Sequence, residues 1–482
     1  MLNISLFFLL VPTSLWLWPE AAGAQQKRVC DLESSQEINS AGRPGARVSY
    51  LSTPFFSCTD GTEIKADSSI TYESTGLTRL IGNVRFREGS QELNAAEAEY
   101  YSSLGILEAR GNVEVEEISR GTFIVGTELL LVQEYEETLE DIMTVRGFPA
   151  SAILTPISPS SSFSTSADNQ AVPSSHIYAD VLYLIGDRLL QAVGHVRVER
   201  DSLELYGDSL EFLQDGSSTK LFSNTKISHR DDLSGKTTTV KGDSVNILFS
   251  DGELELIQSM GQSEAVYDNG RIYGSMVEMF FQDEELNRIH SKRDLTPSPT
   301  QELDSLQATA VISDFTITGE SIELELSRGK LLSATAIGAA RGVSSSLSNV
   351  AVNQQFPFVE EDWIEGDSLV ILFSESKPIG SPSPAQVSEE EDSVIEQMTA
   401  YGNARSFFRK PPSQVATSDS IGNPLPELNY VRGDEVRIFL TDGEIRQMEV
   451  DNAKGSFLQP ISKPDTGTVS KFKIEPRYKE DH

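Results

Sequence analysis

Basic residues are scarce in this sequence. It has 39 lysines and arginines against 73 aspartates and glutamates, which gives a formal net charge of −34. Proteins that bind nucleic acid need clustered lysine and arginine to meet the phosphates, so this balance argues against nucleic acid as a partner. It also argues against docking on an anionic membrane surface. The composition is typical of a protein with an acidic, solvated exterior.

Long apolar runs are lacking everywhere except at the N-terminus. Residues 1–24 are mostly apolar and end in Ala22-Gly23-Ala24, a pattern of small residues that is typical of a signal peptide cleavage site. No lysine or arginine precedes the run, so a retained anchor stays open as the alternative. In either case we expect the rest of the chain to be exported.

Cysteine and histidine are also rare. In an oxidising, exported setting Cys30 and Cys58 are expected to form one disulfide, or each to pair with another protein. None of the five histidines stands at a metal-ligand spacing from another histidine, a cysteine or a carboxylate. The sequence therefore predicts no metal site and no cofactor.

A repeated strand pattern is abundant instead. Apolar and charged residues alternate strictly in Val84–Arg87 and again in Val113–Glu116, and this period of two indicates half-buried strands. A Gly-Asn pair precedes each stretch and supplies a bend that tolerates positive φ. Similar phrases return about every thirty residues, a period that indicates stacked units, none of which can bury its apolar face alone.

The repeats and the low-complexity stretches between them divide the chain. Ser/Pro-rich and acidic compositions cannot bury enough apolar surface to order themselves, so we expect loops there. The expected segments are a signal peptide at 1–24, an N-terminal lead-in at 25–65, a first run of repeats at 66–154, a Ser/Pro-rich loop at 155–176, a second run at 177–290, a loop at 291–307, degenerate repeats with Ser/Pro and acidic inserts at 308–460, and a polar tail at 461–482.

The recurring Gly-Asp-Ser, as at Gly207–Ser209, places an acid beside a hydroxyl. A hydrolase needs one nucleophile, one base and one orienting group in a single site, whereas this phrase recurs from unit to unit. We interpret it as turn chemistry, in which Asp and Ser hydrogen-bond nearby backbone where each strand begins. No enzyme activity is expected, because we find no unique, exposed nucleophile.

Alternation along the strands assigns one face of each to an apolar interior. The candidates for this face are Val84, Phe86, Val113, Val115, Val196, Val198, Leu210, Phe212, Ile247, Phe249, Ile322, Leu324 and Phe373. These side chains fill either a closed, dry β-solenoid or the walls of an open groove for an apolar ligand. Periodicity alone does not separate the two.

The strand Ala66-Asp67-Ser68 to Tyr72, followed by Leu-x-Gly-Asn-Val at 80–84, resembles the OstA/LptA-like family of lipopolysaccharide transport proteins. The resemblance implies a periplasmic, twisted β-jellyroll with a V-shaped apolar interior. It also implies that acyl chains of lipopolysaccharide lie between the walls and that modules stack end to end toward the outer membrane. This chain is much longer than a single-module member, so we expect more than one module in series.

We therefore expect an all-β fold of repeated antiparallel strands, as a twisted β-jellyroll or open β-solenoid. The expected function is non-enzymatic transport of lipopolysaccharide, or a similar envelope glycolipid, along an apolar groove. The expected partners are that glycolipid and other envelope transport proteins, or a second copy joined through edge strands. The alternative is a structural β-repeat protein of the periplasm or cell surface, with a closed core and protein partners.

Overall fold

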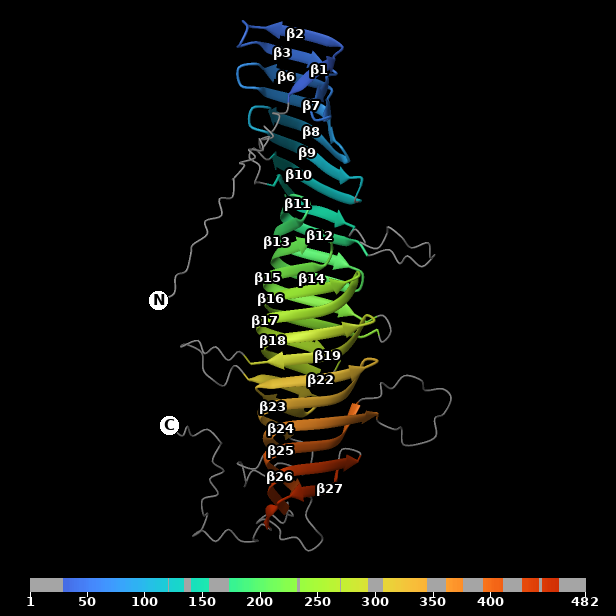
Figure 1. Cartoon of the computed structure of the whole chain (residues 1–482), viewed down its shortest axis with the longest axis vertical. Helices are drawn as coiled ribbons and strands as arrows, with labels where there is room; N and C mark the ends of the chain where they lie inside the picture. The colour runs from blue at the N-terminus through green and yellow to red at the C-terminus, as the bar shows by residue number, and fades with distance from the viewer. Residues whose placement is uncertain are drawn as a thin grey trace, which may run out of the picture.

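The computed structural model of this chain is an elongated rod, in which antiparallel strands are stacked along the long axis from the N-terminal to the C-terminal end (Figure 1). The structure describes residues 29–119, 121–133, 140–155, 173–231, 235–268, 270–293, 307–344, 361–375, 393–410, 427–441 and 444–458.

Strands make up the regular structure of this part of the chain. Those of the N-terminal half are β1 (Cys30–Ser34), β2 (Glu37–Ala41), β3 (Val48–Ser52), β4 (Phe55–Cys58), β5 (Glu63–Lys65), β6 (Ser68–Tyr72), β7 (Leu77–Glu88), β8 (Gln91–Tyr101), β9 (Ile106–Glu117), β10 (Thr122–Val132), β11 (Ile142–Leu154), β12 (Ser175–Ile185), β13 (Leu189–Arg200), β14 (Leu203–Leu213) and β15 (Ser218–Arg230). The rest are β16 (Thr237–Ser250), β17 (Glu253–Tyr267), β18 (Gly270–Gln282), β19 (Glu285–Lys292), β20 (Ala308–Ile312), β21 (Phe315–Gly319), β22 (Ser321–Ser327), β23 (Lys330–Ser344), β24 (Asp362–Glu375), β25 (Ser393–Lys410), β26 (Glu427–Thr441), β27 (Glu444–Asp451) and β28 (Lys454–Leu458).

All 28 strands belong to one sheet, which confirms the expected all-β repeat. From β7 to β18 each strand pairs antiparallel with the next strand of the chain. The same holds from β23 to β26. Between β18 and β23 two short strands take the place of one long strand, as where β19 and β20 both pair with β18. The expected modules therefore continue into one another without a break in the strand pairing.

Each long strand bends near its middle, where a β-bulge shifts the register. In β7 the shift lies between Ile81 and Val84, and the extra residue is accommodated at Gly82 and Asn83, which have φ angles of 80° and 43°. A bulge bends its strand and increases the local twist. Positive φ angles recur at the bends of other strands, at Gly111 and Asn112, Gly194 and His195, Ser223 and Asn224, Gly261, Gly338 and Ala339, and Gly402 and Asn403.

An acidic side chain on the neighbouring strand faces most of these bends. Asn83 Nδ2 donates a hydrogen bond to Asp67 Oδ2 at 2.8 Å, and a Cβ on Gly82 would lie only 2.4 Å from the same oxygen. The pairing recurs between Asn224 and Asp208 (2.7 Å), His195 and Asp180 (2.9 Å), Asn403 and Asp367 (3.4 Å), and Asn452 and Asp434 (2.6 Å). The expectation that these aspartates start strands is wrong for Asp180 and Asp208, which lie at bends inside β12 and β14, whereas Asp67 directly precedes β6.

His195 replaces the usual asparagine at one bend, and its exposed imidazole faces the Asp180 carboxylate at 2.9 Å. The hydrogen bond and charge of Asp180 raise the pKa of His195 above its ordinary value. Because the raised pKa belongs to the folded state, this contact strengthens below that pKa and is lost as the pH rises through it.

We expect Asp180→Asn to lower the pKa of His195 toward the ordinary 6.5 or so. The measurement is an NMR titration of carbon-labelled histidine. His290 is the control, since burial lowers its pKa and it lies on a different strand. A pKa of His195 that does not move in the variant would contradict the pairing.

The bends of successive strands define a corner between two walls. Wall A contains the half-strands 77–81, 97–101 and 106–110, and wall B contains the half-strands 84–88, 91–95 and 113–117. Each of the other half-strands belongs to the wall whose half-strands it pairs with. The buried apolar side chains of both walls form one continuous core. We call the side opposite the corner, where the free ends of the two walls face each other, the mouth.

The described strands begin before the first expected run of repeats. β1 to β5 lie within the expected lead-in at 25–65, and they continue the same sheet, since β5 pairs with β7. The signal peptide at 1–24 and the tail at 461–482 lie outside the described residues, as do most of the expected loops. β11 and β12, on either side of the expected loop 155–176, pair directly, whereas β19 and β20, on either side of the expected loop 291–307, both pair with β18 and not with each other.

Candidate functional site

All of the apolar candidates lie between the two walls, and all are buried. In the middle of the rod the core is filled: Leu210 is 1% exposed, and Phe212 and Ile247 are fully buried. Alanines such as Ala179 and Ala192 pack between these larger side chains and are also fully buried. Such interdigitation of small and large residues is typical of a close-packed protein interior.

A cavity of about 230 Å³ lies between the walls near the N-terminal end of the rod. Phe56 and Ile64 line it from wall B, and Tyr72, Leu80 and Tyr100 line it from wall A. Its lining contains none of the apolar candidates, because Phe56 and Ile64 lie in the expected lead-in and the candidates on β7 come from its wall B half alone. Leu80 lies four residues before Val84, so the alternation that identified Val84 is a sequence signal that could also have identified this part of the cavity lining.

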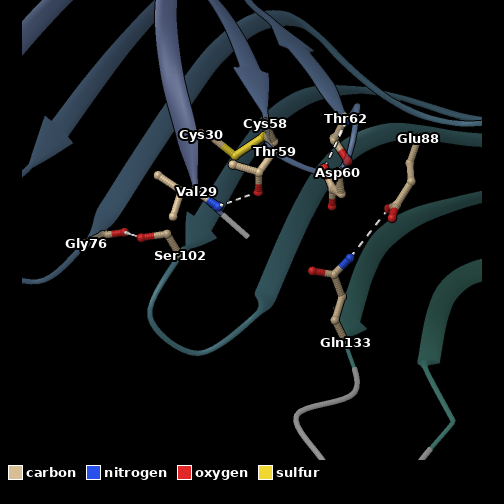
Figure 2. Close-up of a disulfide and its surroundings, with 10 residues drawn as sticks. All are labelled: Val29, Cys30, Cys58, Thr59, Asp60, Thr62, Gly76, Glu88, Ser102 and Gln133. Atoms are coloured by element: carbon tan, nitrogen blue, oxygen red, sulfur yellow. Dashed lines mark hydrogen bonds between the residues drawn. A yellow bond between two sulfur atoms is a disulfide. The ribbon is translucent and has the colours of Figure 1, made fainter. Parts of the chain in front are cut away.

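A disulfide between Cys30 and Cys58 joins β1 to β4 at the wall B side of this cavity (Figure 2). Beside it the backbone amide of Val29 donates to Thr59 Oγ1 at 3.3 Å, and the amide of Thr59 donates to the carbonyl of Val29 at 2.9 Å. The covalent link and this pair of contacts fasten the first strand of the array to its neighbour at the edge of the cavity.

Arg200 spans the mouth in the middle of the rod. It ends the wall B half of β13, and its guanidinium donates to the carbonyls of Gly216 and Gly252, each at 3.2 Å. Both glycines belong to hairpins at the free end of wall A. The guanidinium also lies 3.7 Å from the ring centroid of Phe249. Burial lowers the pKa of Arg200 to about 10, so it is still charged at neutral pH.

Two more side chains cross the mouth from the next strands that end on wall B. His229 of β15 packs edge-on against Phe281 of wall A, with ring centroids 4.9 Å apart. The hydroxyl of Tyr267, at the end of β17, donates to the carbonyl of Gly329 in a wall A hairpin. Burial raises the pKa of Tyr267, so its hydroxyl stays a donor. We call the contacts of Arg200, His229 and Tyr267 the mouth bridges.

A second cavity, of about 60 Å³, lies beside the Tyr267 contact. Ile272 lines it from wall B, and Ile289 and Leu324 line it from wall A. Leu324 is thus the one apolar candidate that also lines either of these two cavities. The volume is close to that of one or two water molecules, so it holds no lipid chain as it stands.

Toward the C-terminal end, Asp362 and Arg409 form a buried ion pair on wall B. Arg409 Nε and Nη2 lie 3.2 Å from the two carboxylate oxygens, and the Arg409 amide donates to Oδ1 at 2.9 Å. The side chains are 0% and 2% exposed. No sequence pattern marks this pair, since the residues stand 47 positions apart on β24 and β25.

The described residues contain no cluster of three or more histidine, cysteine, aspartate or glutamate side chains that could hold a metal ion. The same residues include no helix with the length and apolar character needed to cross a membrane. The N-terminal apolar run lies outside them.

No family model matches this chain, and no curated protein matches it. Among solved structures it is similar to LptH of Pseudomonas aeruginosa, which is described as the LptA-homologous periplasmic component of the lipopolysaccharide transport device. The two are 16% identical, the match covers 28% of this chain and 82% of LptH, and the TM-score is 0.23. A TM-score this low assigns neither fold nor function.

Proposed function

We propose that this chain is a non-enzymatic periplasmic protein that holds acyl chains of lipopolysaccharide, or of a similar envelope glycolipid, between its two walls on the way to the outer membrane. The observation that supports this most is the single apolar interior shared by both walls along the rod, with a cavity of about 230 Å³ near its N-terminal end. Each methylene that is buried contributes about 0.8 kcal/mol. A chain of about ten carbons would therefore contribute several kcal/mol.

The acidic exterior is compatible with an anionic glycolipid as long as the phosphates stay in solvent. An exposed pair of like charges costs only about 1 kcal/mol in water and is screened within about 8 Å at physiological salt. Burial of the acyl chains outweighs this repulsion. Recognition would therefore depend on the apolar tail, with the sugars and phosphates outside the mouth.

Strand addition at the ends of the rod would supply the protein partners. Among the described strands, β2 pairs only with β3 at one end, and β27 and β28 pair only with β26 at the other. Edge strands of this kind accept a further strand from another chain. Other envelope transport proteins, or a second copy of this chain, would extend the apolar interior in this way.

A second candidate is a structural β-repeat protein with a closed core and protein partners. The observation that favours it is the complete burial of the interior in the middle of the rod, for example at Leu182, Phe212 and Ile247. A core packed this densely leaves no room for a ligand unless the walls separate.

Photo-crosslinking separates the two candidates. A photoreactive residue at Leu80, which lines the N-terminal cavity, or at buried Phe86 is expected to give adducts when the purified chain is mixed with lipopolysaccharide micelles. The outward neighbours Arg79 and Arg85 are the matched controls and should give none. Folded protein without adducts at Leu80 and Phe86 would instead favour the structural candidate.

A further inference from the structure

The mouth bridges differ from the contacts that hold the sheet together. Each is made by a side chain, so it can break while the backbone hydrogen bonds of both walls stay paired. Arg200 and Tyr267 donate to backbone carbonyls, so no ion pair has to separate when these contacts break. These contacts can therefore open and close while both walls stay folded.

The positions of the mouth bridges form a regular series. Arg200, His229 and Tyr267 lie on β13, β15 and β17, which run in the same direction and end on wall B. Neighbouring strands are about 4.8 Å apart, so successive bridges follow each other at about 10 Å. The three contacts therefore close a continuous length of mouth over the filled middle part of the interior.

Nearer the N-terminal end of the rod, Gln133 Nε2 donates a hydrogen bond across the mouth to Glu88 at 3.5 Å (Figure 2). This bond lies at the distance limit and is longer than the two bonds of Arg200. The larger cavity lies between the walls in this same part of the rod. The interior thus has a cavity at its N-terminal end and a closed stretch beyond it.

We propose that Arg200, together with the bridges at His229 and Tyr267, forms a gate that holds the two walls closed, and that an acyl chain passes from the N-terminal cavity into the middle of the rod only when this gate opens. The inference rests on the proposed lipid-carrying function for its cargo. The opening of the mouth, however, is a property of the protein alone and can be measured without lipid.

The test compares Arg200→Met with Arg197→Met. The first keeps a long unbranched side chain but removes both donors across the mouth and the guanidinium over Phe249. The second removes an outward guanidinium from the same strand, where it contacts Glu199 and the ring of Tyr206. Arg197→Met therefore controls for loss of an arginine on β13.

Spin labels at Glu204→Cys on wall B and Glu253→Cys on wall A report the width of the mouth. Both side chains are exposed, and the two native cysteines are joined in the disulfide, so labelling is selective. Loss of two hydrogen bonds from a charged donor should raise the population of the open form about tenfold or more. We expect a longer, broader distance distribution in Arg200→Met and no change in Arg197→Met.

A photoreactive residue at Phe212 then reports passage of lipid. With lipopolysaccharide micelles, the adduct yield at Phe212 should rise about tenfold in Arg200→Met, in proportion to the open population. An unchanged label distance would overturn the gate. A wider mouth with no adduct at Phe212 or Leu80 would leave the gate standing and refute the lipid-carrying function.

If Arg200→Met fails to fold, Arg200→Lys is the variant that tests the gate. Lysine keeps the charge but lacks the planar guanidinium, which can donate to two carbonyls at the same time. It should widen the mouth by an intermediate amount, and a wild-type distance distribution in this variant would overturn the gate.

Discussion

Replacing Phe212 with alanine should lower the free energy of local unfolding around β13–β15 by about 3–5 kcal/mol. Phe212 is fully buried between the walls and is among the largest buried side chains of the core. Its removal loses the transfer free energy of the ring and leaves a cavity, which neighbouring strands fixed by ladder hydrogen bonds fill only in part.

Native-state hydrogen exchange of the β13–β15 amides is the suitable measurement, because a repeat array opens in parts rather than in one two-state step. Glu211→Ala, at the neighbouring outward position, is the control and should change the value by no more than about 0.5 kcal/mol. A loss below about 1 kcal/mol for Phe212→Ala would mean that the interior is loosely packed here. That result would favour a groove that stands open without any gate.

Removing the carboxylate of Asp362 should destabilise β24 and β25 by about 3–5 kcal/mol, because Asp362→Ala leaves the cation of Arg409 buried without its counterion. The pair is almost fully buried and is joined by two side-chain hydrogen bonds at 3.2 Å. The main cost is desolvation of the guanidinium, because no opposite charge then compensates for its burial in the low-dielectric interior.

The double variant Asp362→Leu with Arg409→Met tests this cause. It removes both charges and should recover most of the loss, since apolar replacements for a buried ion pair are often neutral. Glu449→Ala, which removes an exposed partner of Arg437, is the surface control and should cost at most about 1 kcal/mol. A double variant as unstable as Asp362→Ala would show that packing, and not the unpaired charge, is responsible.

The strands and their inward faces were predictable because period-two alternation is a local property. Val84 and Phe86, or Val113 and Val115, alternate with charged residues that have to face water, so the side of each strand is determined without knowledge of its partners. The Gly-Asn bends were predictable for a similar reason. Gly82 and Asn83 are residue types that accept positive φ, and both adopt it.

The role of the acidic residue opposite each bend was not predictable in the same way. Locally, a strand with a bulge resembles two strands joined by a turn, so the sequence placed the aspartates at strand starts. The partner of Asp67 is Asn83, 16 positions later, and the partner of Asp367 is Asn403, 36 positions later. Only the strand pairing brings the carboxylates of Asp67 and Asp367 over Gly82 and Gly402, which have no Cβ to collide with them.

By itself the sequence determined the fold class, the repeat, the bends and the set of apolar side chains that face inward, because each follows from periodicity or backbone preference within one or two strands. Tertiary structure alone decided how the walls meet. Arg200 lies 52 positions from Gly252, and Tyr267 lies 62 positions from Gly329. Whether the interior is filled, hollow or closed at the mouth depends on such distant contacts and on side-chain volume summed over many strands, which no local pattern records.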